Sequence, residues 1–203
     1  KPLWTYEAEN KGTSVSLYFY STNMENFQFS NYKKKVIYGF KIMLWKQFIV
    51  WDHEQKEYLK QYCPDATYIQ VGPIDFSGIE CKFLSSKSKK TLSVFDVTPT
   101  RPIYHTKLGW AIPPYYSEEL NHKFLSTILN VFNDDEWEIL WKRKRIVSNE
   151  FVSKGFNIKQ NKIVAGSLVT IDPNVAARSL IENSDAVISM PFTSTSLIAR
   201  ELD

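Results

Sequence analysis

Four consecutive hydroxyl side chains mark the part of the sequence best suited to bind an anion: Thr193, Ser194, Thr195 and Ser196. They follow a short apolar run, residues 186–188, of the kind that is buried in a parallel sheet. Backbone N–H groups in the first turn of a helix lack partners within the helix, and the helix dipole favours negative charge there. The pattern therefore predicts a phosphate site at the start of the last helix. Ser and Thr are also ordinary N-caps, so a plain capped helix is the alternative.

A second candidate for phosphate binding is the cation pair Lys142 and Arg143, directly after the apolar stretch 137–141. A cation placed in advance at the end of a strand can hold a phosphate and stabilise negative charge that develops on it during a reaction. Residues 142–145 are all basic, and one ligand does not reach all of them, so at least two are expected to be solvated. A solvated basic edge or a membrane-facing patch is the alternative.

A third candidate is the loop that follows the strand pattern at residues 91–97. Thr98 can offer a hydroxyl to a phosphate there, and Arg101 a two-point guanidinium contact. Loops at the carboxyl ends of parallel strands share one crevice, so this loop is expected to face the hydroxyl-rich helix start. The alternative is that Asp96 and the threonines only satisfy backbone groups of the turn.

The sequence identifies no general base or nucleophile, and the catalytic residue stays unknown. His105 is the candidate, because it is the histidine expected in a loop that faces the crevice, whereas His53 and His122 fall on predicted helices. Cys63 and Cys81 are too few and too far apart for a metal site, and with no secretory segment two reduced thiols are expected. The chemistry is therefore expected to need no metal and no cofactor.

Alternating strand and helix patterns predict an α/β fold with parallel sheets flanked by helices. Strand patterns fall at residues 13–22, 47–51, 67–71, 91–97, 137–141, 186–188 and, within 163–171, at either 163–164 or 169–171. Helix patterns fall at residues 4–10, 53–62, 117–132, 172–183 and from 193 onward, and residues 147–158 are expected to form a surface helix or an excursion of the chain. Asp52, Ser117 and Asp172 are the predicted N-caps, with Pro173 at the first helical position of its helix.

The composition limits the classes of protein to which the chain can belong. The hydrophobic fraction of 43% is ample for a packed core, and no apolar run is long enough to cross a membrane. The net charge of +3 comes from local lysine and arginine clusters, which fit a phosphate ligand or an anionic membrane surface better than nucleic acid. Residues 73–90, rich in Gly, Pro, Ser and Lys, are the best linker candidate.

The C-terminal stretch SDAVISMPFTSTSLIARELD resembles bacterial surface-polysaccharide biosynthesis proteins named for their Pro-Phe-Thr-Ser motif, here residues 191–194. It is similar, more loosely, to the donor-binding half of glycosyltransferases of the GT-B fold. The resemblance implies two facing, partial Rossmann-like domains in a fragment of a longer protein. Residues 1–72 are then the C-terminal part of an acceptor-side domain, 73–90 a linker, and 91–203 a donor-binding domain truncated at its C-terminus.

The resemblance also implies a function: a nucleotide-sugar-dependent glycosyltransferase of capsule or lipopolysaccharide O-antigen biosynthesis. Its partners are then a nucleotide-sugar donor and a glycan or lipid-linked acceptor, in the cytoplasm or at the inner face of an anionic cytoplasmic membrane. The family pattern often places a ribose-binding Glu, followed by Ala, on the last helix, where this chain has Ile198 and Ala199. This departure leaves open CMP-linked acidic sugars, transfer of a polyol phosphate from a CDP-linked donor, and a non-catalytic nucleotide-binding or assembly protein.

Overall fold

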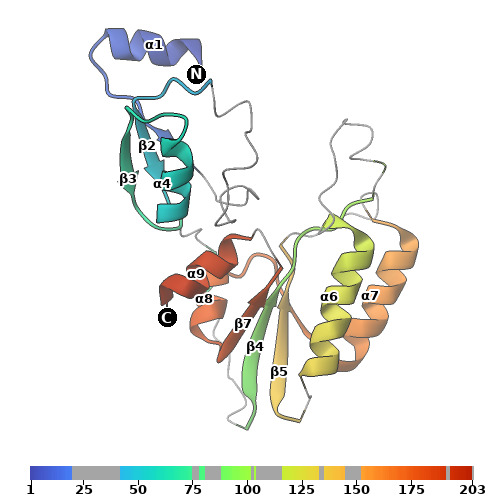
Figure 1. Cartoon of the computed structure of the whole chain (residues 1–203). Helices are drawn as coiled ribbons and strands as arrows, with labels where there is room; N and C mark the ends of the chain where they lie inside the picture. The colour runs from blue at the N-terminus through green and yellow to red at the C-terminus, as the bar shows by residue number, and fades with distance from the viewer. Residues whose placement is uncertain are drawn as a thin grey trace. The chain divides into compact units, whose positions relative to one another are not determined.

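The computed structural model of the chain describes residues 1–19, 42–74, 78–80, 88–101, 103, 116–132, 135–144, 152–190 and 193–202. The chain divides into two compact units, Lys1–Asp75 and Phe76–Asp203. Each unit contains a sheet of parallel strands flanked by helices (Figure 1). The predicted class, an α/β fold with Rossmann-like parallel sheets, is confirmed. The assignment of the units to acceptor and donor sides of a GT-B fold stays a prediction.

The first unit is built on a three-stranded sheet in the order β1-β2-β3. Its elements are α1 (Leu3–Asn10), β1 (Leu17–Tyr18), β2 (Gln47–Val50), α4 (His53–Lys60) and β3 (Thr67–Gln70). As predicted, Asp52 caps α4, because its carboxylate accepts a hydrogen bond from the amide of Gln55 at 2.8 Å. Buried side chains of β2 and α4 form the core of this unit: Phe48, Val50, Tyr58 and Leu59.

The second unit holds a four-stranded parallel sheet in the order β6-β5-β4-β7. Its elements are β4 (Lys90–Phe95), α6 (Glu118–Val131), β5 (Trp137–Lys142), α7 (Lys154–Ser167), β6 (Val169–Ile171), α8 (Ala177–Glu182), β7 (Ala186–Ser189) and α9 (Ser194–Leu202). In order of appearance along the chain, the strands lie 3-2-1-4, as in the first part of a Rossmann sheet. The strand order therefore reverses between β4 and β7.

Helices cover both faces of this sheet, α6 and α7 one face and α8 and α9 the other (Figure 1). The alternation of side chains along each strand assigns residues to the two layers. Leu92 and Val94 of β4 pack with α6, whereas Phe95 packs with α8 and α9. Nearly continuous apolar strands are what a sheet buried on both faces requires.

The prediction for the helix before β6 is wrong in position. Residues 147–151 lie outside the described part of the chain, and α7 begins only after Ser153, whose hydroxyl accepts a hydrogen bond from the amide of Phe156 at 3.1 Å. Ile163, a candidate strand residue, belongs to α7. Phe156 and Gln160 share the buried side of α7, which explains the helical continuation. Of the two predicted strand positions, 169–171 is confirmed.

The predicted start of α8 is also wrong, because Asp172 does not cap the helix. Its carboxylate folds back and accepts a hydrogen bond from the amide of Asn174 at 2.7 Å. Val175 forms a parallel bridge with Ile79, and the amide of Ala176 donates to the carbonyl of Ile79 at 2.9 Å. This long-range pairing holds the segment extended, so α8 starts at Ala177.

Candidate functional site

The carboxyl ends of β4 and β7 are neighbours in the sheet. Phe95 pairs with Ser189, and the amide of Met190 donates a hydrogen bond to the carbonyl of Phe95 at 2.9 Å. The loop that leaves β4 carries Thr98, and α9 begins at Ser194, shortly after β7. Doubly wound sheets bind ligands at this point, where the strand order reverses. The structure thus brings two of the predicted phosphate-binding segments to one edge of the sheet.

The four predicted hydroxyls are engaged to different degrees within the first turn of α9. Thr193 is 4% exposed, and its hydroxyl donates to the carbonyl of Met190 at 3.1 Å and shares a hydrogen bond with the Thr195 hydroxyl at 2.9 Å. The Ser196 hydroxyl donates to the carbonyl of Thr193 at 2.9 Å. These side chains stabilise the turn, so the backbone N–H groups of α9 are its best anion donors.

Lys142 is a buried cation at the carboxyl end of β5. It lies on the sheet face that carries α8 and α9, since side chains alternate and Leu140 packs there. Only 7% of Lys142 is exposed, and its ammonium donates to the carbonyl of Pro173 at 2.9 Å. Burial lowers the pKa of this ammonium, and the carboxylates of Asp96 and Asp172 oppose that shift. Among the residues that the structure describes, this carbonyl is the one hydrogen-bond acceptor of the buried ammonium, which favours capacity for an anionic ligand.

Arg143 points to the other face of the sheet. Its guanidinium stacks on the ring of Trp141, with Cζ 5.3 Å from the ring centroid, and Trp141 packs with α6. Within the described part of the chain, Nη2 of Arg143 and the hydroxyl oxygen of Thr98 are buried atoms without a hydrogen-bond partner. Both follow the carboxyl ends of adjacent strands. Unpaired buried donors are uncommon in folded proteins, and a phosphoryl oxygen can accept from both kinds.

Arg101 is directed to α7 rather than to α9. Its guanidinium Nη2 donates a hydrogen bond to the carbonyl of Val152, next to the start of α7. His105 and Lys107 lie outside the described residues, as do Pro191 and Phe192 of the Pro-Phe-Thr-Ser motif. The role of His105 as a candidate catalytic residue stays a prediction.

The sequence assigned Asp96 to the turn, but its carboxylate belongs to a buried polar network. Asp96 is 3% exposed and accepts hydrogen bonds from Nε1 of Trp141 at 3.2 Å and from the amide of Lys144 at 3.3 Å. Nδ2 of Asn121 lies 3.5 Å from the same carboxylate, and Gln160 of α7 donates to Oδ1 of Asn121 at 3.1 Å. An acidic residue directly after the buried strand β4 was the signal in the sequence.

Burial raises the pKa of the Asp96 carboxyl from 3.8 to about 6, although Arg143 and the hydrogen-bond donors lower it. A carboxyl perturbed by burial and by a specific cation, at the carboxyl end of a strand, is typical of functional sites.

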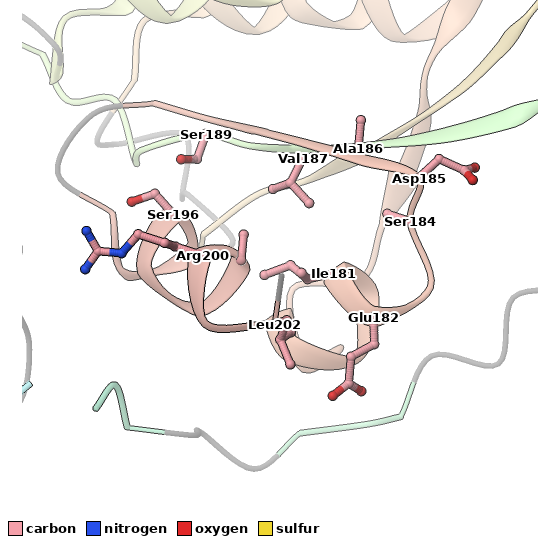
Figure 2. Close-up of a pocket in the computed structure, with 11 residues that line it drawn as sticks. Ile181, Glu182, Ser184, Asp185, Ala186, Val187, Ser189, Ser196, Arg200 and Leu202 are labelled. Carbon is pink, nitrogen blue, oxygen red and sulfur yellow. The ribbon is translucent and has the colours of Figure 1, made fainter. Parts of the chain in front are cut away.

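A groove of about 640 Å³ runs along the outer edge of β7, between α8 and α9 (Figure 2). Figure 2 shows Glu182 and Asp185 at one end of it, and Ser189, Ser196 and Arg200 at the other. The described residues that line it include Ser196 but none from the loops after β4 and β5. The groove is therefore separate from the strand ends that carry Thr98 and Lys142.

Some other kinds of site are absent from the described residues. These ranges contain no cluster of three or more His, Cys, Asp or Glu side chains suited to a metal ion. None of the helices within them has the length and apolar character needed to cross a membrane. Cys63 is a buried free thiol, and Cys81 lies outside the described ranges.

Comparison with known protein families identifies a family that covers the whole chain. The model of the family described as "Polysaccharide biosynthesis PFTS motif protein" matches residues 1–203. No curated protein matches the sequence.

Proposed function

Because the chain belongs to the family of polysaccharide biosynthesis PFTS motif proteins, we propose that it is a nucleotide-sugar-dependent glycosyltransferase of surface polysaccharide assembly. Family membership indicates a role in polysaccharide biosynthesis. The transferase activity is the finer proposal, and the second unit is its proposed donor-binding domain. The first unit then belongs to the acceptor side, which takes a glycan or a lipid-linked acceptor.

The observation that supports this proposal is that several potential anion donors follow the carboxyl ends of strands in one parallel sheet. The first-turn amides of α9 follow β7, and the unpaired hydroxyl of Thr98 follows β4. Lys142 contributes a buried cation on the face that carries α9. Fixed donors of this kind stabilise the charge that develops on a departing nucleotide phosphate. Such electrostatic assistance requires no metal.

The residues of α9 leave the class of nucleotide donor open. Ile198, at the position where related patterns place a ribose-binding Glu, is buried in the core against β4 and β5. A carboxylate clamp on the ribose is therefore not available from this position. We propose that the donor is bound without a ribose-binding carboxylate on α9. CMP-linked acidic sugars and CDP-linked polyol phosphates therefore remain donor candidates beside UDP- and GDP-sugars.

Calorimetric titration of the chain with UDP-, GDP- and CMP-sugars tests the proposal. Binding is expected for one nucleotide class, and Lys142→Met is expected to weaken it about tenfold, the loss of one charge-assisted contact. Lys123→Met, on the exposed side of α6, is the matched control and should leave the affinity unchanged. Failure of every donor to bind would overturn the proposal.

Turnover assays with glycan and lipid-linked acceptors separate the competing functions. Sugar transfer with release of the nucleotide supports a glycosyltransferase. Release of CMP with incorporation of phosphorus into the acceptor identifies a polyol-phosphate transferase. Binding without turnover across all acceptors identifies a nucleotide-binding or assembly protein.

A further inference from the structure

The Asp96 carboxylate holds the residues on both sides of the two strand-end cations. One oxygen accepts a hydrogen bond from Nε1 of Trp141 at 3.2 Å, and the other from the amide of Lys144 at 3.3 Å. Lys142 and Arg143 lie between these two residues in the chain. The single side chain that directly follows β4 thus fixes the course of the chain at the carboxyl end of β5.

The Asp96 carboxylate is itself held from the neighbouring elements. Nδ2 of Asn121, on α6, lies 3.5 Å from the carboxylate, 3.2 Å from the carbonyl of Val97 and 3.7 Å from Sδ of Met190. Gln160 of α7 donates to the other end of the Asn121 amide at 3.1 Å. Asp96, Asn121 and Gln160 are each at most 3% exposed. The network therefore connects β4, β5, α6, α7 and the end of β7.

We propose that Asp96 is a positioning residue of the phosphate site, acting through Trp141 and Lys144 to fix the Arg143 guanidinium. This inference rests on the proposed function, since it assumes that a phosphate binds at the reversal of strand order. Trp141 supplies the ring on which the guanidinium stacks at 5.3 Å, and its indole is oriented by Asp96. A preorganised guanidinium binds a phosphate more tightly than one that must be ordered on binding.

The charges around Asp96 determine how the substitution Asp96→Asn would change phosphate affinity through charge alone. Within the described part of the chain, the charges of Arg143 and Lys142 act on its carboxylate, and α6 and α7 present the neutral Asn121 and Gln160. Removal of a negative charge beside a phosphate site, by itself, strengthens phosphate binding. A weaker affinity after Asp96→Asn must therefore come from lost positioning.

Titration of the whole chain with UDP, GDP and CMP, the probes that carry the phosphates of the proposed donors, tests this inference. Asp96→Asn is expected to weaken the affinity of the best probe about tenfold, the typical effect of a lost hydrogen bond to a charged group. In an Arg143→Met background the same substitution should change the affinity less than about twofold, because no guanidinium remains to be positioned. Circular dichroism confirms that each variant is folded.

Asp185→Asn is the matched control. The Asp185 carboxylate accepts a hydrogen bond from the amide of Thr91 at 2.7 Å, which is a similar tether at the amino ends of β4 and β7. The substitution Asp185→Asn should leave the affinity for the nucleotide probes unchanged. An equal effect of Asp96→Asn in both backgrounds, or an unchanged or stronger affinity, overturns the positioning role and leaves the proposed function standing. If the wild-type chain binds none of the three probes, both proposals fail.

Discussion

The ammonium of Lys142 donates a hydrogen bond to the backbone carbonyl of Pro173 at 2.9 Å, which ties the carboxyl end of β5 to the loop after β6. A lysine that is 7% exposed loses most of its hydration, and one carbonyl compensates for that only in part. A cation held in this way contributes little to stability, which favours a role for Lys142 in binding.

Lys142→Met keeps the apolar stem and removes the charge. The relief of desolvation and the loss of the Pro173 contact oppose each other, so the free energy of unfolding should change by less than about 1.5 kcal/mol. Urea denaturation of the wild type and the variant measures this change. A loss above about 3 kcal/mol would show that Lys142 is mainly a structural residue.

The pH dependence of stability should report the burial of Asp96. Its folded-state pKa is raised to about 6, so its contribution to stability is complete below the ordinary value of 3.8 and is lost as the pH rises through about 6. The shift corresponds to about 3 kcal/mol.

Asp96→Asn removes this titration. The wild type should therefore lose about 3 kcal/mol relative to the variant between about pH 4 and about pH 7. Urea denaturation at a series of pH values measures the difference, in which the effects of other carboxyl groups cancel. A difference that is independent of pH would mean that the Asp96 carboxyl is not buried as the structure shows.

The sequence predicted the elements whose signals are local. Ser117, followed by two glutamates and an amphipathic pattern, predicts α6, and its hydroxyl accepts the amide of Leu120 at 3.1 Å. The run before Asp96, which contains Leu92, Val94 and Phe95, is likewise a local signal, and it predicts β4. Both elements depend on residues that are close in the sequence, and the periodicity of apolar residues therefore predicts them.

Long-range contacts could not be predicted from the sequence. Asp96 meets Trp141 across 45 positions of the chain, and Asn121 meets Gln160 across 39. No pattern within a helix or strand encodes such pairings. The same limit explains α8, where the bridge between Ile79 and Val175 overrides the local capping signal of Asp172.

The close approach of Gly78 to the segment before α8 should make that position intolerant of a side chain. A Cβ atom at Gly78 would lie 2.8 Å from the carbonyl oxygen of Asn174 and 2.9 Å from the amide nitrogen of Ala176. Both are backbone atoms that cannot move without breaking the bridge at Ile79. Gly78→Ala is therefore expected to destabilise the protein by about 1–3 kcal/mol.

Gly155 provides the matched control in the first turn of α7. A Cβ there meets no atom closer than the Ser153 hydroxyl oxygen at 4.0 Å, so Gly155→Ala should stabilise the protein by up to about 1 kcal/mol. Thermal unfolding of both variants gives the comparison. Equal effects of the two substitutions would contradict the close packing at Gly78.

Substitutions in the first turn of α9 can distinguish its backbone amides from its hydroxyls as hydrogen-bond donors to a phosphate. Ser194 is the first residue of the helix, where proline is well tolerated because the N–H has no partner within the helix. Ser194→Pro removes one amide donor and the hydroxyl, whereas Ser194→Ala removes the hydroxyl alone. Since the hydroxyls of Thr193 and Ser196 already donate to backbone carbonyls, the amides should provide the binding.

Ser194→Pro is therefore expected to weaken nucleotide affinity about tenfold with little change in melting temperature, and Ser194→Ala less than about twofold. Titration with the nucleotide that binds the wild type best, among UDP, GDP and CMP, measures both. Equal losses for the two variants would assign the contact to the Ser194 hydroxyl. Unchanged affinity in both would place the phosphate away from α9, because a helix start that holds an anion cannot lose an amide donor without consequence.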